Sequence, residues 1–144
     1  MEGNKLCVLV SACLLGENCK FNGGNNDNQA VKNFLTNKQA VPICSELLAG
    51  LPTPRPPAEI VNGRVTEVTG QDVHERYQLG VREAMELIKD QSIDLAILQS
   101  CSPTCGVNQV YDGQFVGRKI SGSGLFAQTL RENGYRVIDA EDIK

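Results

Sequence analysis

The chain has 144 residues, of which 41% are hydrophobic and 22% charged, with a formal net charge of −3 and a pI near 5.2. These proportions are ordinary for one globular domain, so we treat residues 1–144 as a single domain. The acidic balance, without a Lys/Arg cluster, argues against a nucleic acid polymer as partner. The apolar run at 6–10 is too short for a signal peptide or a membrane helix, so we expect a cytoplasmic protein with no membrane partner.

Four apolar runs, at 6–11, 40–44, 94–100 and 135–139, predict strands. Their lack of polar alternation is typical of parallel strands covered on both faces. Helical patterns at 28–35, 73–88 and 124–132 lie between them, and Asn-Gly within 59–65 and Asp-Gly within 109–115 predict tight hairpin turns. We therefore predict an α/β fold: an open, mostly parallel, Rossmann-like three-layer sheet with two small β-hairpin insertions.

Cysteines follow three of the predicted strands. Cys13 comes after the first, Cys44 ends the second, and Cys101 and Cys105 follow the third. Ligands of open parallel sheets bind in the crevice outside the carboxyl ends of the strands. If these strands are neighbours, Cys13, Cys44 and either Cys101 or Cys105 would meet at one edge of the sheet.

The remaining sulfurs and two polar residues complete this list of candidates. Cys7 lies inside the first strand and is expected in the core, whereas Cys19 lies in a loop and is interpreted as an inert surface thiol or a spare ligand. Glu46 follows Cys44 by two residues, and Ser102 precedes Cys105 by three. Both are candidates for catalysis, although a first-turn helix carboxylate and a turn-capping hydroxyl explain them equally well.

Three thiolates suit some metal groups better than others. A structural zinc site normally has four ligands, often in C-x-x-C pairs, and the sequence contains no such pair. A 4Fe-4S cluster held by three thiolates would leave one iron open to a substrate, where it acts as a Lewis acid. A cluster with an open iron therefore predicts chemistry rather than electron storage.

Four blocks, "LVSACLLGENCKFNGG", "VPICSELLAGLPTPRPPAEI", "GQDV" and "CSPTCGVNQVYDGQFVG", occur in order along the chain. With these blocks the chain resembles a bacterial domain-of-unknown-function family that includes the 4Fe-4S-dependent thiouracil desulfidase, in its short, single-domain form. The resemblance implies a 4Fe-4S cluster on Cys13, Cys44 and Cys105, with Glu46 and Ser102 in catalysis. Two departures from the family pattern are Ser45, where proline is usual, and Cys101, where a basic or polar residue is commoner; we interpret Cys101 as a bystander.

The activity implied by the resemblance is non-redox desulfuration of a small thiolated nucleobase, such as 2-thiouracil to uracil plus hydrogen sulfide. Arg55, between two prolines, and Asp112, in the second hairpin, are candidate substrate contacts. Two alternatives stay open: a cysteine-persulfide sulfurtransferase that uses Cys105 without a cluster, and a non-enzymatic iron-sulfur sensor or carrier. A cluster with an open iron is exposed to oxidation, so an aerobically prepared sample can lose it. The sequence does not indicate the oligomeric state.

Overall fold

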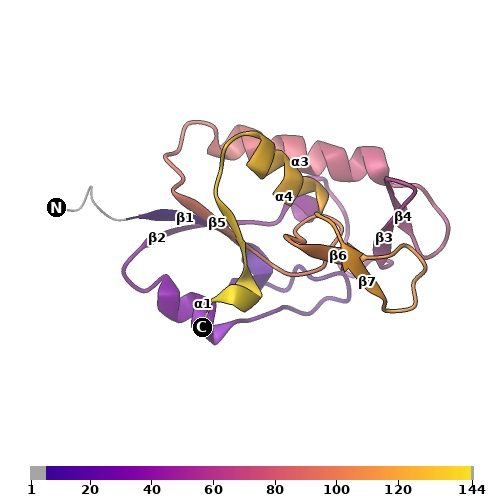
Figure 1. Cartoon of the computed structure of the whole chain (residues 1–144), viewed down its shortest axis with the longest axis horizontal. Coiled ribbons are helices and arrows are strands. Elements are labelled where there is room, and N and C mark those ends of the chain that lie inside the picture. The colour runs from indigo at the N-terminus through magenta and orange to yellow at the C-terminus, as the bar shows by residue number, and fades with distance from the viewer. Residues whose placement is uncertain (1–5, 144) are drawn as a thin grey trace.

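A central parallel sheet organises the molecule, which a computed structural model describes for residues 6–143 (Figure 1). The strand order is β2-β1-β5-β8, and every pairing is parallel. The strands are β1 (Cys7–Ser11), β2 (Gln39–Ile43), β5 (Leu95–Leu98) and β8 (Val137–Asp139). The four predicted strands are all present, with ends that differ by at most two residues from the expected ranges.

Helices cover both faces of the sheet. The helices α3 (His74–Ile88) and α4 (Leu125–Glu132) lie on one face, and α1 (Gln29–Phe34) lies on the other with the short 3-10 helices η2 (Ala12–Leu15) and η3 (Ala140–Asp142) (Figure 1). Leu9 packs toward α3 and α4, whereas Val8 and Val10 pack toward α1, because successive strand residues face opposite sides. The predicted three-layer α/β fold is confirmed.

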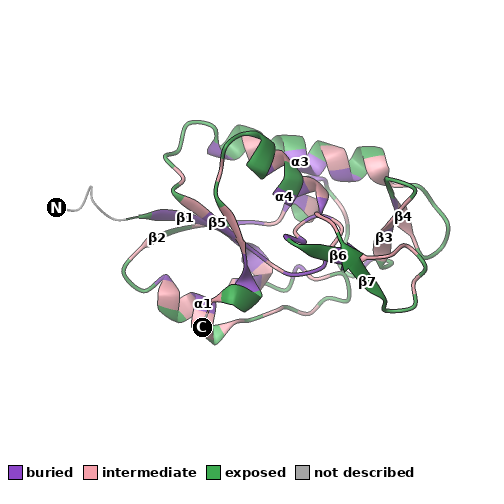
Figure 2. Ribbon diagram, viewed as in Figure 1, coloured by how far each residue is buried: buried purple, intermediate pink, exposed green. Residues whose placement is uncertain are grey.

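The strands differ in how well they are covered, as Figure 2 illustrates. Every residue of β1 is buried, but β2 is an edge strand in which Gln39, Ala40 and Pro42 are exposed. The expectation that every strand is covered on both faces is therefore wrong for β2. An edge position also explains how the strand tolerates Pro42, which has no N–H to donate to a neighbour.

Two hairpins lie beyond the carboxyl ends of the sheet (Figure 1). The strands β3 (Ala58–Val61) and β4 (Arg64–Glu67) are joined by Asn62 and Gly63, whose φ angles of 50° and 80° make the predicted tight turn. The second hairpin pairs β6 (Gln109–Tyr111) with β7 (Lys119–Ser121). Residues 112–118 intervene, so the tight turn expected at Asp-Gly is wrong.

The reason for the longer second loop is a side chain from the first hairpin. Glu59 Oε1 accepts the N–H of Gly113 at 2.9 Å and that of Phe115 at 3.2 Å. These amides are therefore bound to a carboxylate instead of to a facing strand, and the strands pair only farther along the chain. The two hairpins are joined into one wall by this contact.

A short helix that the sequence did not predict, α2 (Ser45–Leu48), follows β2 directly. It lies so close to α3 that a Cβ placed on Gly80 would be 2.0 Å from the carbonyl oxygen of Ser45. Only glycine permits this approach, which fixes α2 against the core. Within residues 6–143, no helix combines the length and the apolar character needed to cross a membrane.

Candidate functional site

Three cysteines lie at the carboxyl ends of three adjacent strands. Cys13 is in η2 after β1, Cys44 is the N-cap residue of α2 after β2, and Cys105 is in the turn that follows β5. Cys105 Sγ accepts a hydrogen bond at 3.4 Å from the hydroxyl of Ser11, the last residue of β1. Cys13 Sγ accepts one at 3.4 Å from Asn26 Nδ2. The expected neighbourhood of the strands is confirmed, and it brings these thiols to one edge.

Among residues 6–143, no three His, Cys, Asp or Glu side chains are placed to hold a single metal ion in this structure.

Cys19 is a fourth thiol of the site, and its interpretation as an inert surface residue is wrong. It is buried, with 4% of its surface exposed. Hydrogen bonding with Cys13, then with Cys44, raises the pKa of the Cys19 thiol far above its usual range. The same contact with Cys19 lowers the pKa of Cys13 to about 7 and also lowers the pKa of Cys44. The three thiols therefore share hydrogen bonds, and this contact favours the thiolate form of Cys13 and Cys44.

The other cysteines have different surroundings. Burial raises the pKa of the Cys105 thiol above its usual range, although the hydroxyl of Ser11 opposes this effect. Cys7 is buried in β1, as expected, and Cys101 is buried with a positive φ of 66° and a bridge to Val110. Among the six cysteines, all of which are free, Cys101 and Cys7 therefore have structural surroundings.

Glu46 is held in the first turn of α2 by polar partners on both of its oxygens. Arg55 donates to Oε1 from Nε at 3.0 Å and from Nη2, and Thr104 Oγ1 donates to Oε2 at 2.8 Å. The side chain of Glu46 is 14% exposed and that of Arg55 is 4% exposed. A buried ion pair of this kind fixes a carboxylate in one orientation.

The hydroxyl of Ser102 caps a turn by accepting two backbone N–H groups, and its own hydrogen is not part of these bonds. Its Oγ accepts the N–H of Cys105 at 2.6 Å and that of Thr104 at 3.1 Å. A hydroxyl oxygen has two lone pairs and one hydrogen to donate. Because both lone pairs are engaged by the backbone, the hydrogen is left to donate to another group.

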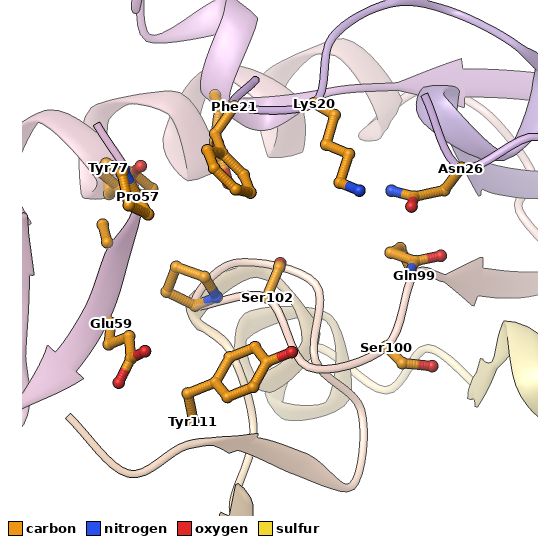
Figure 3. Close-up of a pocket in the computed structure, with 13 residues that line it drawn as sticks. Lys20, Phe21, Asn26, Pro57, Glu59, Tyr77, Gln99, Ser100, Ser102 and Tyr111 are labelled. Atoms are coloured by element: carbon orange, nitrogen blue, oxygen red, sulfur yellow. The ribbon is translucent and has the colours of Figure 1, made fainter. Parts of the chain in front are cut away.

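A cavity of about 380 Å³ opens beside these residues, and both Glu46 and Ser102 line it. Figure 3 shows Ser102 on its wall. Sequence reasoning missed most of its other walls. The loop 16–28 contributes Lys20, Phe21 and Asn26, and the two hairpins contribute Glu59 and Tyr111. Lys20, Phe21 and Asn26 lie outside every predicted element, whereas Glu59 and Tyr111 lie in the two predicted hairpins, for which the Asn-Gly and Asp-Gly turn signals were the cue.

The two predicted substrate contacts, Arg55 and Asp112, are not placed as expected from the sequence. All five N–H groups of Arg55 have protein partners: Glu46 accepts two, and the other acceptors are the carbonyls of Cys19 and Pro52 and the hydroxyl of Thr53. In this arrangement Arg55 has no donor left for a substrate carbonyl. Asp112 is outside the cavity lining.

The surroundings of Asp112 are those of a loop residue. Its carboxylate accepts the N–H of Gln114 at 2.9 Å and lies 3.7 Å from Arg118 Nε. Both partners belong to the loop between β6 and β7. Asp112 therefore shapes that loop, and its prediction as a substrate contact gains no support from this geometry.

The fold and these residues define an α/β protein whose cysteines gather at one edge of a parallel sheet, beside a carboxylate and a hydroxyl. The profile of the 2-thiouracil desulfurase family matches residues 8–142, and the chain belongs to this family. The family resemblance expected from the sequence is confirmed.

One curated relative and one solved structure were compared with the chain. The relative is Bacillus subtilis (strain 168) YbbK, described as an uncharacterized protein, which is 37% identical over 146 residues and covers 94% of this chain and 97% of its own. The structure is the [4Fe-4S]-dependent thiouracil desulfidase TudS, with a TM-score of 0.89 and 33% identity over 96% of this chain and 93% of that one. Both matches extend over nearly the whole fold, and together with the family they support an enzyme of the desulfidase class.

Proposed function

We propose that the protein removes sulfur from a small thiolated nucleobase by hydrolysis, converting a thiocarbonyl such as that of 2-thiouracil to a carbonyl. Water supplies the oxygen and two protons, and the sulfur leaves as hydrogen sulfide, so neither an oxidant nor a reductant is consumed. The observation that carries the proposal is the position of Glu46 and Ser102 on the wall of one cavity. Cys13, Cys44 and Cys105 follow the strands β1, β2 and β5 at the same edge of the sheet. Membership of the desulfurase family supports the same reaction.

Cys13, Cys44 and Cys105 are the residues that would hold a 4Fe-4S cluster. Their support is the donor set itself: three sulfurs spread over three strand ends, two of them with a lowered pKa that favours the ligating thiolate. When bound, a cluster with three protein ligands supplies an iron atom that is open to the soft sulfur of a thiocarbonyl. TudS, which is similar to this chain over its length, is described as 4Fe-4S-dependent.

The protein side chains move the protons. Glu46 accepts a proton from the attacking water and passes it to the departing sulfur, a task worth about 10²- to 10⁴-fold in rate for a positioned general base. Ser102, whose hydroxyl hydrogen is not used by the protein, donates to the substrate or to the water and orients it. Lys20 and Asn26 on one side of the cavity, facing Ser102 and Tyr111 on the other, surround the substrate with polar groups (Figure 3).

The alternative of a cluster-free sulfurtransferase requires Cys105 as a thiolate nucleophile. Burial raises the pKa of this thiol, which disfavours a free thiolate nucleophile at neutral pH, whereas a bound metal atom would itself favour the deprotonated form. We also propose a cytoplasmic location, because six free cysteines are typical of a reducing compartment.

Anaerobic reconstitution with iron and sulfide, followed by assay with 2-thiouracil, tests the proposal. We expect uptake of about four irons per chain, as a 4Fe-4S cluster requires, with sulfide and uracil released in equal amounts. Replacement of Glu46 by Gln is expected to retain the iron and to lower kcat by at least about 10²-fold. A chain that binds iron but releases no sulfide would instead favour a sensor or carrier, and iron uptake no higher than background would refute the cluster.

A further inference from the structure

The carboxylate of Glu46 has only one acceptor position left for the cavity. An ionised carboxylate offers about four lone-pair sites, two on each oxygen. Arg55 occupies two sites on Oε1 through Nε and Nη2, and Thr104 occupies one on Oε2. Glu46 lines the cavity, so the remaining site on Oε2 is the one available to a water molecule or a substrate.

Neither partner of Glu46 is free to move independently. The guanidinium of Arg55 is anchored by the carbonyl of Cys19 at 2.8 Å, the carbonyl of Pro52 at 3.2 Å and the hydroxyl of Thr53 at 3.0 Å. These acceptors belong to the loop 16–28 and to the proline-rich segment 51–57. Arg55 therefore fixes Oε1 of Glu46 relative to two chain segments at once.

Thr104 fixes the second oxygen from a different part of the fold. Its side chain is almost fully buried, with 1% of the residue exposed. Its carbonyl accepts the N–H of Phe126 at 2.9 Å and that of Ala127 at 3.2 Å, at the start of α4. Thr104 is thus bound to the helix on one side and to Glu46 on the other.

We infer that Arg55 and Thr104 are positioning residues, which together direct the free acceptor of Glu46 Oε2 into the cavity. The terminal torsion of a glutamate is broad, so a carboxylate held on one oxygen alone would still rotate. Hydrogen bonds to both oxygens, from separate elements, remove that rotation. The inference rests on the proposed function, because it explains how the Glu46 carboxylate is oriented in that reaction.

The experiment compares reconstituted Thr104→Val and Thr104→Ser enzymes with the matched control Thr129→Val. Thr129 lies in α4, and its hydroxyl donates to the carbonyl of Leu125, away from the cavity. We expect Thr104→Val to lower kcat for 2-thiouracil by about 10-fold and to leave KM within about twofold of the wild-type value. The reason is that a wrongly oriented base affects the transition state rather than substrate binding. Thr104→Ser, which restores the hydroxyl, should recover most of the rate, and iron content should stay unchanged.

A second variant keeps the test independent of Thr104. Arg55→Lys retains the charge but loses the planar fork, so we expect a similar fall in kcat with iron retained. The inference is overturned if Thr104→Val matches Thr129→Val in kcat, if Thr104→Ser is as impaired as Thr104→Val, or if the loss follows KM or iron content. It is also overturned if Arg55→Lys leaves kcat unchanged.

These results separate the inference from the function on which it rests. If Glu46→Gln retains full activity, Glu46 is not the base, and both the proposed role and its positioning fail. If Glu46→Gln is inactive while the Thr104 and Arg55 variants remain as active as the control, only the positioning fails.

Discussion

Gly124 provides the sharpest test of how closely the site depends on packing. It is the N-cap residue of α4, with φ −71° and ψ 168°, a conformation open to any residue. A Cβ added there would lie 2.4 Å from the carbonyl carbon of Thr104 and 2.9 Å from the amide nitrogen of Cys105, whereas ordinary contact begins at 3.4 Å. The substitution Gly124→Ala therefore perturbs the site by contact alone and not by backbone strain.

The displacement required is about 1 Å, and a misplacement of about 1 Å costs about 10²-fold in rate where geometry controls catalysis. We expect Gly124→Ala to lower kcat/KM for 2-thiouracil by that order, and to lower iron per chain because the Cys105 segment must move. Sulfide release, iron content and the thermal midpoint are measured together under anaerobic conditions.

Gly122→Ala is the matched control for this variant. Its added Cβ would meet only the end of the Val110 side chain, at 3.1 Å, and its activity should stay within about threefold of the wild type because a side-chain end can give way. The reasoning is refuted if Gly124→Ala and Gly122→Ala have equal kcat/KM and equal iron content.

Two further outcomes concern the thiols and the hairpin wall. In the cluster-free protein, the alkylation rate of Cys13, followed by peptide mass mapping, should have its midpoint near pH 7, because the thiolate forms above the pKa. Cys19→Ala should move this midpoint to higher pH, because it removes the hydrogen bond that favours the Cys13 thiolate. An unchanged midpoint would contradict the role of this hydrogen bond. Glu59→Ala leaves the N–H groups of Gly113 and Phe115 without their acceptor, so it should lower the free energy of unfolding in urea by about 1–3 kcal/mol. Glu59→Gln keeps an amide oxygen as acceptor and should lose less stability. Equal losses in the two variants would argue against the contact.

The central sheet could be predicted because its signal is local and strong. The run Leu95–Leu98 is apolar along its whole length, and Val8, Leu9 and Val10 form a similar run in β1. The exposure of β2 could not be read in the same way, since Ala40 and Val41 look equally apolar in a central strand and an edge strand. Position within a sheet depends on pairing, which one segment does not specify.

In the candidate site, too, the residues with a local sequence signal could be predicted and those that depend on distant contacts could not. Cysteines at strand ends could be found because the end of a strand is a local feature, and the topology then brings those ends together. The burial of Cys19 and the engagement of Arg55 depend on where the loop 16–28 folds back, through contacts such as Arg55 N–H to the Phe21 carbonyl at 2.7 Å. Loops without hydrophobic periodicity give no such signal, so the sequence predicts neither the burial of Cys19 nor the partners of Arg55.

The order of the three cysteines along the chain has a consequence for biosynthesis. Cys13 and Cys44 are synthesised early, but their edge of the sheet gains Cys105 only after β5 has emerged and paired with β1. A cofactor that needs all three sulfurs would therefore gain its last ligand only after residue 105 has been synthesised, when α4 and β8 still have to be added to the fold.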